Sequence, residues 1–269
     1  VLNSIYIDMV RGGFSEIFSG LQSFSVFCGL SADEFYLFGG ANEEMERFYS
    51  NRLMVDQRGG DGNRYWTGLY ALLFRVNGVI GHLVNSKVDQ GGLTKTVRDQ
   101  LLGEAFFIRA FAHFYLTIMY GDIPVVTISD YKVNALMTRA PQDLVWIKII
   151  EDLQQANALL SEQYLDGKLK TYSGSVERVR PTRWAAIALL SRVYLYSGNY
   201  VAAEAAATMI INATGFFELL PLNDVFKKNS REAIWQLQPV QSGRNTMDAI
   251  TFVIPATGFN SFNPVSLSD

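Results

Sequence analysis

The length, composition and charge of the chain are those of a folded protein without a polyanionic partner. Its 269 residues are 49% hydrophobic and 13% aromatic, and 23 basic residues stand against 26 acidic ones, for a net charge of −3. This size allows one large domain or two ordinary ones, and the composition excludes a disordered chain. Because the charges nearly balance and no long basic run occurs, we do not expect nucleic acid as a partner. The single cysteine, Cys28, excludes an internal disulfide and a cysteine-based metal site, and we expect it to be a buried thiol.

The sequence predicts no membrane-spanning helix. Such a helix needs about 20 consecutive apolar residues. The best candidate, residues 105–120, is interrupted by Arg109 and His113. No signal-peptide pattern precedes the first helical segment.

A helix followed by a long irregular stretch is expected at the start of the chain. Residues 1–20 carry apolar side chains at helical spacing, and the inward face comprises Leu2, Ile5, Met9, Phe14 and Ile17. From residue 21 to 62 the periodicity disappears, while glycines and aromatic residues accumulate. We therefore expect a loop-rich region at 21–62, and a loop region of this length in a compact domain is usually functional.

The next segment, residues 63–86, is predicted to be helical. Its apolar residues recur every three or four positions and form one stripe: Trp66, Leu69, Leu73, Val76, Ile80 and Leu83. Because Trp66 heads this stripe, we place its ring in the core.

A second long helix, over residues 97–119, is expected at the centre of the protein. It is apolar around most of its circumference, so it must be buried between neighbouring helices. The spacing of Thr96 and Asp99 predicts a capping box at its start. Gly121 offers a left-handed stop at its end.

The second half of the chain predicts further helices. A helix is expected at 141–161, an exposed polar excursion at 164–180, and a pair of antiparallel helices at 181–213. The pair has the residue spacing of a tetratricopeptide unit, and Gly198 and Asn199 form its turn. Beyond it we expect a short strand at residues 233–238 and loop-like chain at residues 241–269.

Four segments of the chain form a characteristic series. They are RYWTGLYALLFRVNGVI at 64–80, GEAFFIRAFAHFYLTIMYGDIPVVT at 103–127, APQDLVWIKIIEDLQQANALL at 140–160 and PTRWAAIALLSRVYLYSGNYVAAEAAATMII at 181–211. In this order they resemble the RagB/SusD family of outer-membrane nutrient-binding lipoproteins from Bacteroidetes, and the segment at 103–127 resembles it most strongly. The resemblance implies a mostly α fold of tetratricopeptide-like stacked helix pairs, with long loops and minor β structure. It implies a helical domain at 1–240 that includes the loop-rich region 21–62.

The same resemblance implies that a large C-terminal portion begins at 241–269 and that a lipid anchor lies outside this chain. It implies a lipoprotein exposed on the outer membrane, which binds oligosaccharide and delivers it to a SusC-like TonB-dependent transporter. The implied partners are a glycan and this transporter, the latter docking on the helical face. No cofactor is implied.

No constellation of catalytic residues appears, so we expect a protein without enzymatic activity. The only histidines, His82 and His113, lack metal-ligand spacing, and no nucleophile elbow or phosphate-binding loop occurs. We expect His113 to be a hydrogen-bonded structural residue. Glu104 and Arg109 point to different sides of their helix and are not a pair. A buried Arg109 needs a carboxylate partner, for which Asp122 is the candidate.

The candidate ligand site lies in the loop-rich region. Sugars present C–H faces to aromatic rings and hydroxyl groups to polar side chains, so an open glycan site needs both. Residues 33–63 supply them, and the candidates are Tyr36, Phe38, Tyr49, Arg58, Asp61 and Asn63. Tyr172, in the polar excursion, is a weaker candidate. The alternative is a purely structural role, in which these rings hold the loop against the helices and bind no ligand.

Two other functions stay open. A RagB-type receptor would bind peptides through strand edges or a charged cleft. A tetratricopeptide scaffold would bind only proteins and would show uniform repeats, whereas here one helix pair alone matches closely. The sequence does not identify the ligand.

Overall fold

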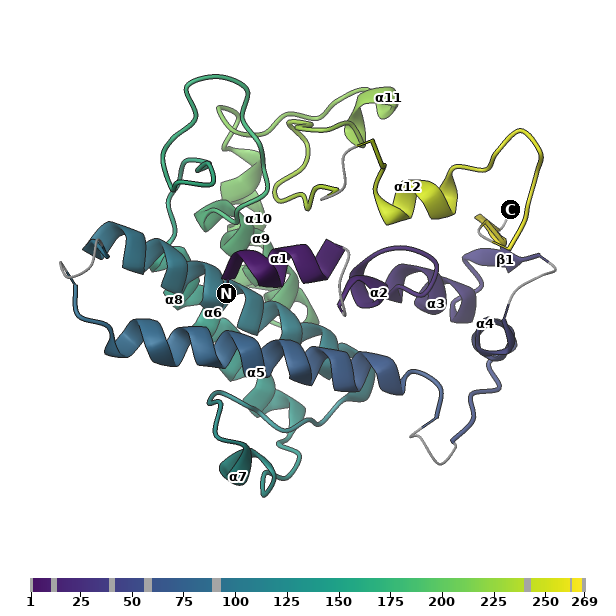
Figure 1. Cartoon of the computed structure of the whole chain (residues 1–269), viewed down its shortest axis with the longest axis horizontal. Helices are drawn as coiled ribbons and strands as arrows, with labels where there is room; N and C mark the ends of the chain where they lie inside the picture. The colour runs from purple at the N-terminus through teal and green to yellow at the C-terminus, as the bar shows by residue number, and fades with distance from the viewer. Residues whose placement is uncertain are drawn as a thin grey trace. The chain divides into compact units, whose positions relative to one another are not determined.

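The structure is a computed structural model (Figure 1), and it describes residues 2–10, 14–38, 42–55, 60–88, 93–239, 243–261 and 263–267. The chain divides into two compact units. The helical unit comprises Tyr70–Leu237 with the first two residues, and the terminal unit comprises Asn3–Leu69 and Gln238–Asp269. Residues 3–69 thus group with the end of the chain, and the domain boundary near residue 240 stays a prediction.

The helical unit is a stack of long helices, as predicted. Its elements are most of α5 (Asn63–Asn85), then α6 (Lys95–Tyr120), α7 (Tyr131–Asn134), α8 (Gln142–Leu159), α9 (Arg183–Tyr196), α10 (Tyr200–Ile211) and α11 (Leu222–Val225). α6 packs on α8, α8 on α9, and α9 on α10. This arrangement confirms the mostly α fold of stacked helix pairs.

α6 is the central helix, but its capping residue differs from the prediction. Thr94, not Thr96, is the N-cap, and its hydroxyl accepts a hydrogen bond from the Val97 amide at 3.3 Å. The helix therefore begins two residues earlier than expected, and Asp99 instead pairs with Lys95. At the other end Gly121 has φ +66°, which closes the helix as expected.

Two helices, α5 and α6, are long and apolar enough to cross a membrane by length and composition alone. In α6, 72% of the most apolar stretch is buried inside the protein. That burial is the pattern of a core helix, in agreement with the prediction from Arg109 and His113.

Five polar side chains of α6 are buried, and the surroundings of three of them, Glu104, Arg109 and His113, bear on the prediction. Arg109 pairs with Asp152 on α8, not with Asp122, and Glu104 pairs with Arg180. As predicted, Glu104 and Arg109 do not pair with each other. His113 is fully buried, as expected of a structural residue, and its ring lies near the Arg109 backbone, although neither ring nitrogen makes a hydrogen bond of standard geometry within the described chain.

The helix pair α9–α10 turns where the sequence predicts. Gly198 has φ +79°, a conformation that glycine adopts at low cost. The side chain of Asn199 caps α10 by accepting from the Ala202 amide at 3.2 Å. Ala203 and Ala206 are buried, and their small side chains allow close approach between the two helices.

The segments that flank this pair differ from the prediction. The excursion at 164–180 is anchored rather than fully exposed, because Tyr164, Arg178 and Arg180 are all buried. Residues 233–238 form no strand. The Gln236 amide donates to the Arg178 carbonyl at 2.9 Å, but the segment does not form the repeated hydrogen bonds of a β-strand.

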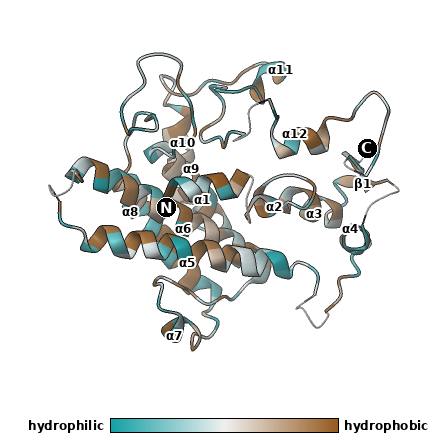
Figure 2. Cartoon of the chain, in the orientation of Figure 1, coloured by the Kyte–Doolittle hydropathy of each residue, from teal (hydrophilic) through white to brown (hydrophobic). Residues whose placement is uncertain are grey.

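The terminal unit contains more regular structure than the sequence suggested. Its elements are α1 (Leu2–Val10), α2 (Ser15–Phe18), α3 (Phe24–Ser31), β1 (Phe35–Leu37), α4 (Glu43–Tyr49), the start of α5, α12 (Met247–Phe252) and β2 (Val265–Leu267). The expectation of loops over 21–62 and 241–269 is therefore wrong for these elements. α3 and α4 are too short to show several turns of periodicity, and Figure 2 shows α3 as mainly hydrophobic and α4 as mainly hydrophilic.

An aromatic core holds the terminal unit together. Phe24 stacks on Tyr65 with ring centroids 4.5 Å apart, and Phe27 meets Phe48 edge-on at the same distance. Tyr65 is fully buried, whereas Trp66 is only partly buried, so Tyr65 rather than Trp66 heads the inward stripe of α5. The predicted inward face of the first helical segment is confirmed: Leu2, Ile5, Met9, Phe14 and Ile17 are buried. Cys28 is exposed, contrary to expectation.

Candidate functional site

The first part of the candidate site is an aromatic group on β1. β1 pairs antiparallel with β2, and Tyr36 lies opposite Ser266. The Tyr36 side chain is 46% exposed, whereas Phe35 and Leu37 are partly buried. Side chains two residues apart in a strand point to the same face, which places Phe38 beside Tyr36.

Phe38 has a partner that comes from the distant end of the chain. Its ring stacks on that of Phe259, with centroids 3.7 Å apart and an angle of 11° between the planes. The Phe38 amide also donates to the Pro264 carbonyl at 2.7 Å, which fixes the backbone here. Phe259 is itself 40% exposed. We call Tyr36, Phe38 and Phe259 the aromatic platform.

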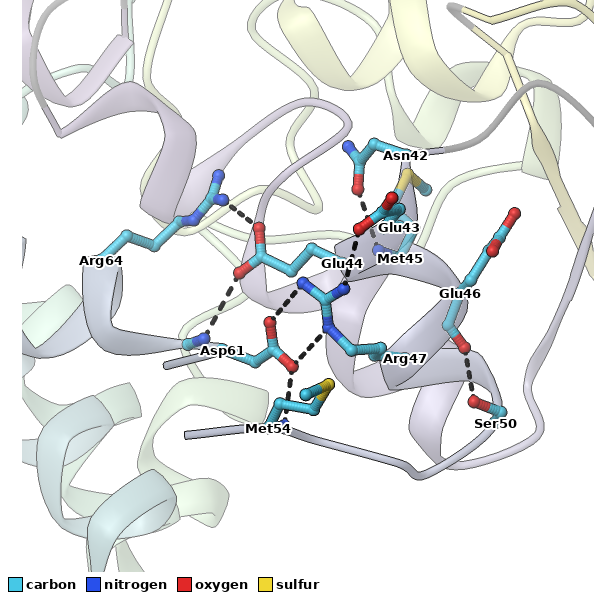
Figure 3. A network of polar contacts seen from close by, with 11 residues as sticks. Asn42, Glu43, Glu44, Met45, Glu46, Arg47, Ser50, Met54, Asp61 and Arg64 are labelled. Atoms are coloured by element: carbon cyan, nitrogen blue, oxygen red, sulfur yellow. Dashed lines mark hydrogen bonds and ion pairs between the residues drawn. The ribbon is translucent and has the colours of Figure 1, made fainter. Parts of the chain in front are cut away.

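The second part is a polar network between α4 and the loop that leads into α5 (Figure 3). Arg47 donates from Nε and Nη2 to the two oxygens of Asp61, at 2.7 and 2.8 Å. Asp61 also accepts from the Met54 amide at 2.9 Å, and Arg47 reaches Glu43 at 3.4 Å. Both ends of the loop are thus tied to α4 through one carboxylate.

A second ion pair extends this network to the start of α5. Glu44 accepts from the guanidinium of Arg64 and from the Gly62 amide. Arg64 donates as well to the side chain of Gln22. These bonds hold the first turn of α5 against α4, as Figure 3 shows for Glu44 and Arg64.

The charges in the network are mutually stabilised. The hydrogen bond from Arg47 is the main reason that the pKa of Asp61 lies below its usual range, and the pKa of Arg47 is raised by the same bond. A carboxylate kept ionised in a charge-assisted pair is a poor proton donor. Asp61 is therefore suited to positioning the loop and accepting hydrogen bonds, not to acid catalysis.

The remaining predicted residues are placed as follows. Tyr49 is partly buried in the last turn of α4, and Asn63 is partly buried at the first residue of α5. Arg58 lies outside the described residues. Tyr36 lies on β1 and Phe38 directly follows this strand, whereas Asp61 and Asn63 lie together at the α4–α5 connection. The candidates therefore belong to two places on the terminal unit.

Sequence reasoning missed Phe259, Arg47 and Arg64. Phe259 carries no local signal, since its role arises from a partner at the other end of the chain. Arg47 could have been found, because the helical segment at 43–49 places it one turn after Glu43. The described residues contain no group of three or more His, Cys, Asp or Glu side chains that could hold a metal ion.

Comparison with known proteins places the chain in a family. Residues 37–195 match the SusD-like family model that is described as "Starch-binding associating with outer membrane". The chain belongs to the SusD-like family. This match confirms the RagB/SusD resemblance, and it covers α4 to α9 as well as part of the candidate site.

Curated relatives of this SusD-like chain carry the same name. It is 26% identical over 171 residues to SusD-like protein P2 of Formosa agariphila, which covers 63% of this chain and 31% of the relative. It is 27% identical over 195 residues to a SusD-like protein of Bacteroides ovatus, which covers 66% of this chain and 33% of the relative. The matched part therefore spans about a third of each relative.

Solved structures show the same fold. The match to a SusD superfamily protein from Bacteroides thetaiotaomicron covers all of this chain and 58% of that protein's chain, with a TM-score of 0.80 and 18% identity. The match to a laminarin-binding SusD-like protein covers 83% of this chain and 46% of that protein's chain, with a TM-score of 0.68 and 21% identity. The match to surface glycan-binding protein A of Bacteroides fluxus covers 87% of this chain and 48% of that protein's chain, with a TM-score of 0.68 and 22% identity.

Proposed function

We propose that this SusD-like chain is part of a lipoprotein on the outer face of the outer membrane that binds oligosaccharide. It passes the glycan to a SusC-like TonB-dependent transporter and carries out no chemistry on it. The aromatic platform is the observation that carries this proposal, within a family described as starch-binding.

The platform has the features that sugar binding requires. Tyr36 and Phe259 are 46% and 40% exposed, so their rings are available to the apolar C–H face of a sugar. The stack between Phe38 and Phe259 restrains the Phe259 ring, which reduces the entropy that this ring loses on binding. Asn63 and Asp61, near the start of α5, are candidates for hydrogen bonds to sugar hydroxyl groups.

The helical unit offers a surface for the transporter. Phe114 of α6 packs against Trp146 of α8 and Tyr196 of α9, which brings one end of each of these helices together. This end carries exposed apolar side chains, which we call the apolar end: Ile118, Leu144, Ile147, Leu195, Tyr196, Tyr200 and Val201. Large exposed apolar patches mark protein interfaces, so we assign this one to the transporter.

A binding screen tests the glycan part of the proposal. The purified protein is run through gels that contain single polysaccharides, and hits are measured by calorimetry. Tyr36→Ala and Phe259→Ala should each lower the affinity about tenfold, the lower end of the roughly 1–3 kcal/mol that a nucleic-acid base gains by stacking on an aromatic side chain. Tyr131→Ala is the matched control, since Tyr131 is 71% exposed on α7 and lies outside the platform.

The outcomes separate the proposal from its alternatives. Glycan binding that all three variants retain would remove the platform from the site. Binding of peptides, without binding of any glycan, would favour the RagB-type receptor. For the transporter, Leu144→Asp and Val201→Asp should reduce co-purification with a SusC-like partner, whereas Glu46→Gln, on α4, should not.

A further inference from the structure

We propose that a pocket in the helical unit binds a negatively charged sugar unit, one that carries a carboxylate or a sulfate group. The pocket lies between the excursion at 164–180 and the segment that follows α10, and its volume is about 360 Å³. Sites for small molecules begin near this size. The inference rests on the proposed saccharide binding and adds a second site with its own ligand class.

The charge of the pocket is carried by an unusual arginine. Three arginines are buried in the described part of the chain: Arg109, Arg178 and Arg180. Arg109 and Arg180 each have a carboxylate partner, Asp152 and Glu104. Arg178 is 5% exposed and lines the pocket, but no described carboxylate is in ion-pair contact with it. A buried charge without a counter-ion is costly, and a bound anion would remove that cost.

The contacts of Arg178 leave donors for such a ligand. Its guanidinium donates to the hydroxyl of Tyr164 and to the carbonyls of Ala233 and Phe216, at 2.8 to 2.9 Å. These neutral acceptors use three of the five N–H donors of an arginine. They hold the group rigidly without neutralising it. The remaining donors have no hydrogen bond within the described chain.

The only other charged side chain in the described lining of the pocket is also positive. Arg231 contributes a second guanidinium, and no aspartate or glutamate lines the pocket. Arg231 contacts Glu218 at 3.1 Å, but this pair is half exposed and screened by solvent. Arg178 and Arg231 are the only charged side chains in the described lining, so the wall that they form favours an anion, while Glu177 and Asp166 act on the Tyr172 hydroxyl from outside the lining. Arginine also binds carboxylate and sulfate oxygens in a bidentate manner.

The neutral lining residues favour a sugar as the carrier of the charge. Tyr172 presents a partly buried ring whose hydroxyl makes no hydrogen bond within the described chain. Gln163 and Ser175 add an amide and a hydroxyl. A ring for stacking, polar groups for hydroxyls and a cationic wall together match an acidic monosaccharide unit. A bare inorganic anion would not need the ring.

The test uses monosaccharides titrated into the ¹⁵N-labelled protein and followed by amide chemical shifts. The probes are D-glucuronate and D-glucose 6-sulfate, with D-glucose as the neutral reference and inorganic sulfate as the reference without a ring. At least one acidic sugar should bind tenfold or more tightly than both references, with shifts at Tyr172 and Arg231. Arg231→Gln should weaken it about tenfold, because hydrogen bonds between charged groups are among the strongest.

Matched variants control for charge and ring. Arg192→Gln removes the same charge from an exposed position on α9, and Tyr131→Ala removes a ring from α7; neither should change the affinity more than twofold. Arg178→Lys should also weaken binding, and its melting curve reports whether it folds.

Three results would overturn the proposal: equal binding of D-glucose, equal binding of inorganic sulfate, or unchanged affinity in Arg231→Gln. Failure of the proposed function is seen separately, because the platform variant Tyr36→Ala should leave glucuronate binding unchanged.

Discussion

Arg109 on α6 donates to both carboxylate oxygens of Asp152 on α8, each at 2.7 Å, and both side chains are almost completely buried. Asn77 of α5 and the Thr127 carbonyl accept from the same guanidinium at 3.1 Å. One side chain thus joins three segments of the helical unit. The pair connects residues 43 positions apart.

Breaking this pair should destabilise the protein strongly. Arg109→Met leaves Asp152 buried with only Lys148 nearby, and loss of one partner of a buried pair costs about 3–5 kcal/mol. Urea denaturation measures this difference. Lys227→Met, which breaks the exposed pair with Asp224, is the control and should cost less than about 1 kcal/mol. Equal losses in the two variants would contradict the assigned role.

His113 should make stability depend on pH in a defined window. Burial is the main reason that its pKa falls from 6.5 to about 4; the Asp152 carboxylate raises the pKa by a smaller amount, and the Arg109 guanidinium lowers it further. Below pH 6.5 the unfolded chain binds a proton that the folded protein refuses, so stability decreases from pH 6.5 to about pH 4. The loss reaches roughly 3 kcal/mol.

The pH dependence of stability is compared between two histidine variants and the unchanged protein. His113→Met should remove this part of the pH dependence, while His82→Gln, at an exposed position, should retain it. If the slopes of His113→Met and the unchanged protein agree, the histidine is not the titrating group.

Two glycines should respond in opposite ways to alanine. At Gly103 a Cβ atom would lie 2.8 Å from Leu160 Cγ and 3.1 Å from the Leu160 amide nitrogen, so Gly103→Ala should cost about 1–3 kcal/mol. At Gly78, on the exposed face of α5, no atom lies within 4 Å, and Gly78→Ala should stabilise by up to about 1 kcal/mol. Thermal unfolding distinguishes the two, and a stabilising Gly103→Ala would contradict the close packing.

The start of α6 can be tested with two threonines. Thr94→Ala removes the hydroxyl that caps the Val97 amide and should cost about 1 kcal/mol. Thr96→Ala lies within the helix and should cost little, because alanine is the better helix former. A larger loss in Thr96→Ala would restore the capping box that the sequence suggests.

Asp61 should act by holding the loop. Asp61→Asn and Arg47→Met both break the bidentate pair, so both should increase tryptic cleavage after Arg52 at pH 7. Because the pKa of Asp61 is lowered, the pair is intact at neutral pH and is lost only as the pH falls below 3.8. Glu46→Gln is the control, since its carboxylate points away from the network in Figure 3. Weaker ligand binding without increased cleavage would instead indicate direct contact.

The sequence by itself determined the long helices α5, α6, α8, α9 and α10 and the turn between α9 and α10. The stripe that continues through Leu69, Val76 and Ile80 is a local property, because a helix repeats every 3.6 residues whatever its neighbours are. Gly198 marks its turn for an equally local reason, its positive φ. The family resemblance follows from these same segments.

Only the tertiary structure decided which distant side chains meet. Asp152 rather than Asp122 neutralises Arg109, and Phe259 rather than a loop neighbour stacks on Phe38. The unneutralised Arg178 becomes visible only when its carbonyl partners are known. No periodicity encodes such pairs, because they depend on how elements pack and on which charges are left without a counter-ion after burial.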